Sequence, residues 1–146
     1  MVGHKSAILW SPEEALNLYL DGDKSRVVDL EDAEDIDRRF PKFQKAQRHT
    51  CHLQPGDVLY IPALWFHNMT AIDFGLAVNV FWKNLEPGLY DKKDAYGNRD
   101  LLPAAKAARM LDNVIKQLDE LPAEARDFYA RQLIARLDKK CLVNPL

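Results

Sequence analysis

Between residues 47 and 82, short apolar segments alternate with turn residues, and this pattern limits the fold more than any other feature of the chain. The tripeptide Pro55-Gly56-Asp57 is a turn signal between two strand candidates. Residues 75–82 are rich in Val, Leu, Phe and Trp, which are common in strands. The expected strands are residues 5–10, 49–53, 58–61, 64–70 and 75–82. The first half of the chain is therefore predicted to be mainly β.

After Pro87 the pattern changes to a helical one. Apolar residues recur at helical spacing from Ala104 to Leu118, which predicts an amphipathic helix. Pro122 suits the first turn of a second helix, whose apolar stripe runs from Ala130 to Leu137. A short link makes the two helices antiparallel. Their outer stripes need cover from the sheet or from a second copy, and we favour a homodimer through these helices.

The composition is that of an ordinary globular chain, with 47% hydrophobic and 29% charged residues. No apolar run approaches the roughly 20 residues that cross a bilayer. The N-terminal residues lack the apolar segment of a signal peptide, so a cytoplasmic or nuclear location is expected. Cys51 and Cys141 are the two cysteines, and their positions do not suggest a disulfide framework.

Residues 55–68 carry the strongest functional signal. A turn starts an apolar strand, Pro62 ends it, and an aromatic pair leads the next strand to His67. Trp65 and His67 share one strand face because side chains alternate. A histidine on the inner face of a small barrel, surrounded by aromatic side chains, suits a neutral imidazole that binds a metal.

This segment, followed by residues 75–82, resembles the last barrel strands of the JmjC-domain Fe(II)/2-oxoglutarate-dependent hydroxylases. The resemblance continues through residues 90–98 and 121–131. It is strongest to members that hydroxylate a wybutosine-type modified guanosine in tRNA(Phe). It implies a partial double-stranded β-helix (a JmjC/cupin-like jelly roll) over residues 1–88, and an antiparallel helical hairpin over residues 89–146 that forms a dimer.

The resemblance also implies roles for three residues. His67 matches the distal iron-binding histidine, and Lys5 matches the lysine that pairs with the far carboxylate of 2-oxoglutarate. Asn79 matches an asparagine beside this co-substrate. The other two iron ligands of the family form a His-x-Asp pair ahead of that lysine, and this sequence does not contain it. Fe(II) and 2-oxoglutarate are therefore expected in the intact enzyme, and this chain alone is expected to be inactive.

Simpler interpretations remain open. A single strand histidine is more often packed than metal-bound, and Lys5 without the resemblance would be an ordinary strand-edge lysine. His49 and Cys51 should lie on one strand face and His52 on the other, so they should not form a metal site. The alternative functions are a non-catalytic dimerisation or RNA-binding module, and a related JmjC protein hydroxylase.

A basic run with interleaved aromatic residues follows the acidic residues 31–37. One interpretation is a solvated loop that balances this acidic stretch. The other is a contact surface for tRNA phosphates, with Phe40 and Phe43 packed beneath. The basic residues of the run are Arg38, Arg39, Lys42, Lys45 and Arg48.

Overall fold

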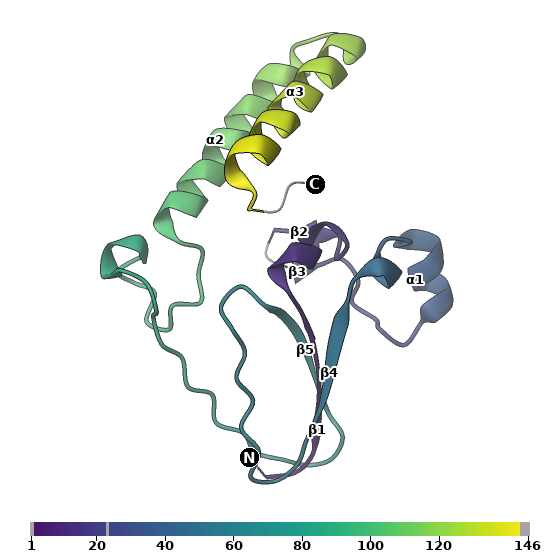
Figure 1. The fold of residues 1–146 in the computed structure, drawn as a ribbon, viewed down its shortest axis with the longest axis vertical. Coiled ribbons are helices and arrows are strands. Elements are labelled where there is room, and N and C mark those ends of the chain that lie inside the picture. The colour runs from purple at the N-terminus through teal and green to yellow at the C-terminus, as the bar shows by residue number, and fades with distance from the viewer. Residues whose placement is uncertain (1, 23, 144–146) are drawn as a thin grey trace. The chain divides into compact units, whose positions relative to one another are not determined.

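The computed structural model describes residues 2–22 and 24–143. The chain divides into two compact units, residues 1–79 and residues 80–146, and each unit is described by itself. The first unit contains the sheet, and the second contains the two long helices (Figure 1). Among the described residues, no helix is both long and apolar enough to span a membrane.

A three-stranded antiparallel sheet is the centre of the first unit (Figure 1). Its middle strand is β1 (Lys5–Trp10), which pairs with β4 (Arg48–Leu53) on one side and β5 (Phe66–Ala71) on the other. The strands predicted at 5–10, 49–53 and 64–70 are therefore present, with small shifts at their ends. Pro12 follows β1 and begins a 3-10 helix, because proline has no N–H for a strand ladder.

The core of the first unit lies at one end of the sheet. Trp10 and Leu18 are buried there, and Phe43 packs on them. A second buried cluster contains Ile36 and Phe40. The elements around these clusters are η1 (Pro12–Leu16), β2 (Leu20–Asp21), β3 (Lys24–Ser25), α1 (Ala33–Arg39) and η2 (Phe43–Lys45).

Two of the expected strands are not formed. Residues 58–61 and 75–82 have no strand ladder in the described part of the chain, apart from an isolated bridge between Val2 and Leu76. Val58 is 94% exposed and Val78 is 83% exposed. The composition of these segments favours strands. A strand also needs a neighbouring strand that accepts and donates its backbone hydrogen bonds.

Residues 20–39 contain a short hairpin and a helix, neither of which was predicted from the sequence. β2 and β3 form a small hairpin, and α1 follows. The Asp32 carboxylate accepts a hydrogen bond from the Asp35 N–H at 2.9 Å and so caps the helix. Ser11 precedes η1, and its side chain makes no capping hydrogen bond.

The second unit contains the predicted helical hairpin. After η3 (Pro87–Leu89), helix α2 (Leu102–Asp119) is followed by α3 (Ala123–Cys141), and the two run antiparallel (Figure 1). Arg126 bonds to Asp119 at 3.3 Å across the link. Within the described residues, neither helix contains a buried side chain. The apolar stripe of α2 is therefore not the core of this unit.

Candidate functional site

The sheet register places Lys5 and His67 on the same face. His67 lies directly opposite Leu9, and Lys5 is four residues from Leu9 on the same strand. Paired residues share a face, and alternate residues along a strand do too. Lys5 is half-buried and His67 is exposed. Asn79 is also exposed, and it lies in the unpaired segment outside the sheet.

A second histidine lies on this face. His49 pairs with Leu9 from the other side. The Cβ atoms of His49 and His67 therefore lie roughly 10 Å apart, with Leu9 between them. The His49 ring contacts the Trp65 ring, with centroids 5.6 Å apart. The Trp65 carbonyl oxygen lies 3.4 Å from Nδ1 of His67. Such a contact is too long to hold the ring strongly.

The described residues do not by themselves fit an iron centre of the 2-His-1-carboxylate type. That centre needs two imidazoles and one carboxylate on one side of the metal. Within residues 2–22 and 24–143, no three His, Cys, Asp or Glu side chains are grouped to hold an ion. His49 and Cys51 face one side of β4 and His52 faces the other, as the alternation predicted.

A contact between His4 and Asp73 fixes the start of β1. The His4 backbone N–H donates to Asp73 Oδ1 at 2.6 Å, and the His4 ring Nδ1 lies 2.6 Å from Oδ2. The backbone hydrogen bond, followed by the ring contact, holds the pKa of Asp73 below its ordinary value. Gly3 and Gly75 permit this approach, because a Cβ on Gly3 would lie 2.4 Å from the Phe74 carbonyl oxygen. The contact positions Lys5, and sequence analysis missed it.

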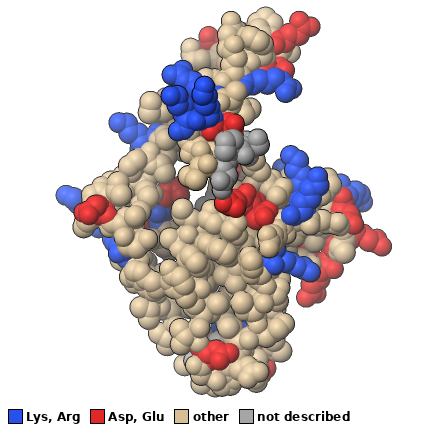
Figure 2. Space-filling view, in the orientation of Figure 1, with Lys and Arg blue, Asp and Glu red and all other residues tan. Residues whose placement is uncertain are grey.

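The first two arginines of the basic run lie in the last turn of α1 and share one carboxylate. Arg38 and Arg39 both bond to Asp35, at 2.8 and 3.0 Å. The hydrogen bond from Arg38 is the main cause that lowers the pKa of Asp35. Figure 2 shows acidic and basic side chains interleaved over the α1 region. Phe40 is buried and Phe43 half-buried, as expected, while contact with tRNA stays a prediction.

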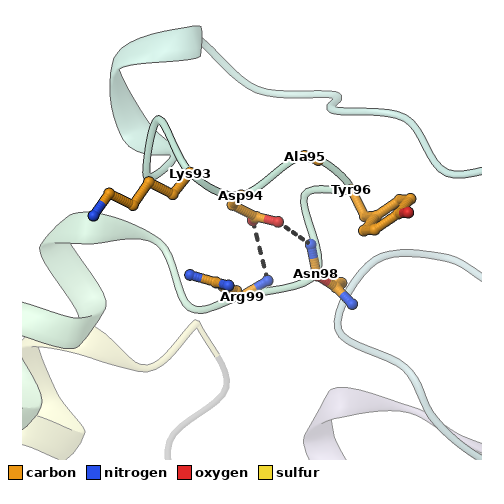
Figure 3. A pocket seen from close by; sticks show the side chains of 6 residues that line it. All are labelled: Lys93, Asp94, Ala95, Tyr96, Asn98 and Arg99. Carbon is orange, nitrogen blue, oxygen red and sulfur yellow. Dashed lines mark hydrogen bonds between the residues drawn. The ribbon is translucent and has the colours of Figure 1, made fainter.

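A polar loop in the second unit was not assigned a role from the sequence. We call residues 91–99 the Asp94 loop. Asp94 is only 2% exposed and accepts hydrogen bonds from the backbone N–H groups of Gly97, Asn98 and Arg99 (Figure 3). The spacing of an Asp and a Gly three residues later is typical of such a turn and could have indicated it.

The Asp94 loop also packs on residues that precede it. The Tyr90 hydroxyl donates to Asn84 Oδ1 and accepts from the Leu85 N–H, both at 3.2 Å. The Lys83 ammonium lies 5.3 Å from the centroid of the Tyr90 ring. Gly97 has a φ of +70°, and a Cβ there would lie 2.8 Å from the Lys83 side chain. The loop is therefore a defined structure rather than a loose connection.

Comparisons with known proteins agree with this architecture. Residues 1–86 match the family model described as Cupin-like domain. The chain is 50% identical over 144 residues to tRNA wybutosine-synthesizing protein 5 of Danio rerio, covering 99% of this chain and 44% of that protein. For the Homo sapiens protein of the same name, identity is 49% over 140 residues, covering 96% and 44%.

A second group of similar proteins has a different number in its name. The tRNA wybutosine-synthesizing protein 4 of Gibberella zeae is 36% identical over 137 residues, covering 92% of this chain and 13% of that protein. The chain thus spans less than half the length of the curated relatives it matches.

Proposed function

The chain belongs to the Cupin-like domain family, and from this premise we propose that it is the C-terminal part of a tRNA-modifying hydroxylase. The proposed substrate is the wybutosine-type modified guanosine of tRNA(Phe). The observation that carries this proposal is the 50% identity over 144 residues to a protein named for wybutosine synthesis. At that identity, two chains share a fold, and a common substrate is a reasonable expectation.

The proposed cofactors of the intact enzyme are Fe(II) and 2-oxoglutarate. His67 would supply one iron ligand, and the Lys5 ammonium would pair with the far carboxylate of 2-oxoglutarate. Asn79 would lie beside this co-substrate. The shared sheet face of Lys5 and His67 supports the first two roles. The metal and co-substrate would supply the oxidative chemistry, and the protein would position the substrate.

The described residues alone do not assemble the iron ligands, so we derive no reaction step from this chain. This same observation favours a second candidate function, a non-catalytic dimerisation or RNA-binding module. The two functions differ in whether His67 is needed for the modified nucleoside to form.

A mutation of His67 in the gene that encodes this chain distinguishes the two candidate functions. For His67→Ala, we expect the hydroxylated nucleoside to disappear from tRNA(Phe) and its precursor, lacking one oxygen atom, to accumulate. Mass spectrometry of nucleosides from purified tRNA measures both. His52→Ala is the matched control, because His52 is exposed on the opposite face of the sheet. Unchanged modification in His67→Ala would contradict the hydroxylase proposal.

We further propose that the basic run contacts tRNA phosphates. Arg38→Glu, Arg39→Glu and Lys42→Glu together should weaken tRNA binding and reduce its dependence on salt, since fewer counterions would be released. Fluorescence anisotropy with labelled tRNA at several salt concentrations measures both quantities. The pairing of both arginines with Asp35 limits the expected effect. If affinity and salt dependence are unchanged, the run is only a solvated surface.

A further inference from the structure

The Asp94 loop carries two cations, Lys93 and Arg99, that form no ion pair with any carboxylate of the described residues. Among the described residues, the structure has no ion pair to Lys93 or Arg99, whereas Arg38 and Arg39 both pair with Asp35. Lys93 and Arg99 extend toward the same side of the loop (Figure 3). Both residues are exposed, so their charges are available to an anion from solvent.

Backbone hydrogen bonds position both cations: the Lys93 N–H donates to the Asp91 carboxylate at 2.7 Å, and the Arg99 N–H donates to the Asp94 carboxylate at 3.2 Å. Burial would raise the pKa of Asp94, but backbone hydrogen bonds from Arg99, Gly97 and Asn98, together with the charge of Lys83, lower it. The carboxylate therefore stays ionised at neutral pH and keeps its three N–H donors. Because the donors include the backbone of Arg99, this network fixes where the Arg99 side chain leaves the loop.

An open depression of about 360 Å³ lies at this loop. Lys93 and Arg99 line it together with Tyr96 and Asn98 (Figure 3). The Tyr96 ring makes an edge contact with the Phe81 ring, with centroids 5.7 Å apart and an angle of 63° between the ring planes. Tyr96 is nevertheless 63% exposed. Tyr96 and Asn98 extend to the side of the loop away from the two cations. The loop thus presents two cations on one side and an exposed ring with an amide on the other.

This combination fits a nucleotide better than it fits a simple anion. A phosphate needs cations, and an unpaired base needs an aromatic surface and a polar edge. The unit that carries the loop has 12 Lys and Arg against 10 Asp and Glu, whereas residues 1–79 have 8 against 12. The second unit therefore has a small positive net charge, which favours contact with a polyanion.

We propose that the Asp94 loop binds single-stranded RNA, with a phosphate at Lys93 and Arg99 and a base stacked on Tyr96. The choice of RNA rests on the proposed function in tRNA modification, and the loop names where this chain would hold its substrate. The Asn98 amide can donate to or accept from the base edge. Unpaired RNA is the specified ligand, because a base must be unstacked from its neighbours before it can stack on an aromatic side chain.

The probe is a fluorescein-labelled oligouridylate of about eight nucleotides, within the usual site size of single-strand binding proteins. It is titrated by anisotropy against the 146-residue chain at several salt concentrations. The variant Lys93→Ala/Arg99→Ala should bind about tenfold more weakly, and its salt slope should fall by about 0.7, the contribution of one neutralised phosphate on a single strand. Lys92→Ala/Lys116→Ala removes the same charge outside the depression and should change affinity less than about twofold.

Tyr96 provides the second arm. Tyr96→Leu should weaken binding by roughly fivefold through lost stacking, and Tyr96→Phe should keep the wild-type affinity. Circular dichroism of each variant confirms that the helices remain folded. Equal losses of affinity in the two double-alanine variants would overturn the proposal, and so would wild-type affinity in Tyr96→Leu. It would also be overturned if polyglutamate displaced the labelled RNA as well as unlabelled oligouridylate does. The His67→Ala nucleoside measurement is independent, so either proposal can fail alone.

Discussion

Asp94 shows how one buried carboxylate can organise a loop. It is the one charged residue that is buried within the described chain, and it is balanced by three backbone N–H donors. Buried charges persist only where hydrogen bonds or opposite charges replace water. The pKa of Asp94 lies below its ordinary value of 3.8 in the folded chain. The ionised form is therefore favoured by folding, and the stability it contributes depends on pH.

The sign of this dependence follows from the lowered pKa. The contribution of Asp94 is fully present above its unfolded pKa and is lost as pH falls through the lower folded pKa. Asp94→Asn should therefore melt at a lower temperature than the wild type near pH 7 and lose less stability on acidification. Thermal melts followed by Tyr and Trp circular dichroism measure this. Asp100→Asn is the control, because Asp100 is exposed. The prediction would be contradicted if the melting temperatures of the wild type and Asp94→Asn changed equally with pH.

Leu64 has a backbone conformation that is unfavourable for a residue with a side chain. Its φ is +67°, in the left-handed region where a Cβ is unfavourable, and its side chain is 79% exposed. It lies just before Trp65 and β5, so its backbone directs the strand that carries His67.

Glycine at this position should relieve the cost. Leu64→Gly should stabilise the chain by about 0.5 kcal/mol, because a strain of about 1–2 kcal/mol is removed and backbone entropy takes back part of it. Leu64→Ala keeps the Cβ and should give no such gain. Urea unfolding followed by tryptophan fluorescence compares the three chains. Equal stability of the Gly and Ala variants would show that φ at this residue carries no cost.

At the scale of elements, the helical hairpin leaves apolar side chains in solvent. On α2, Leu111 and Ile115 lie one turn apart and are 48% and 47% exposed. On α3, Ile134 and Leu137 are 57% and 51% exposed. Contiguous apolar surface of this kind usually marks an interface. We propose that a second copy of the hairpin covers it, which makes the protein a homodimer.

Charge introduced into this stripe should prevent association. Leu111→Lys/Ile115→Lys should be monomeric at micromolar concentration, because two ammonium groups would have to be buried in the interface. Asp112→Lys changes the net charge by the same amount from the neighbouring position and should stay dimeric. Size-exclusion chromatography with light scattering reads the mass of each. A monomeric wild-type chain under these conditions would remove the dimer proposal.

At the scale of the whole molecule, the chain supplies one of the three iron ligands that the family resemblance implies. His67 is the single residue that the family resemblance assigns to the metal, and a facial triad needs two more ligands. The described residues provide no group of three. A single exposed imidazole binds Fe(II) weakly, since it gains little over the water ligands it displaces.

Anaerobic calorimetric titration of Fe(II) into the 146-residue chain tests this expectation. The chain and its His67→Ala variant should show the same weak binding, and addition of 2-oxoglutarate should not change either. Tight binding with one ion per chain that disappears in His67→Ala would show that this chain assembles a metal centre by itself. The nucleoside analysis of His67→Ala remains a separate test of the intact enzyme.

The elements that could be predicted from the sequence are those whose signals are local. The strand from Lys5 to Trp10 is predicted by its composition and by the proline that follows it. Helix α3 begins after Pro122, where helix-start chemistry predicted it. Alternation along β4 also correctly separated His52 from His49, because the side-chain period of a strand is a property of the backbone.

Tertiary structure decided what depends on a distant partner. Residues 75–82 have strand composition, yet pairing requires a neighbouring strand that composition cannot reveal. His4 and Asp73 are 69 residues apart, and only the antiparallel register of β1 with β5 brings them together. The sequence by itself therefore determined the family, three of the five expected strands with the faces of their side chains, and the helical hairpin. Which carboxylates are paired, which segments stay unpaired and which cations remain free required the folded chain, because these properties depend on contacts between residues far apart in sequence.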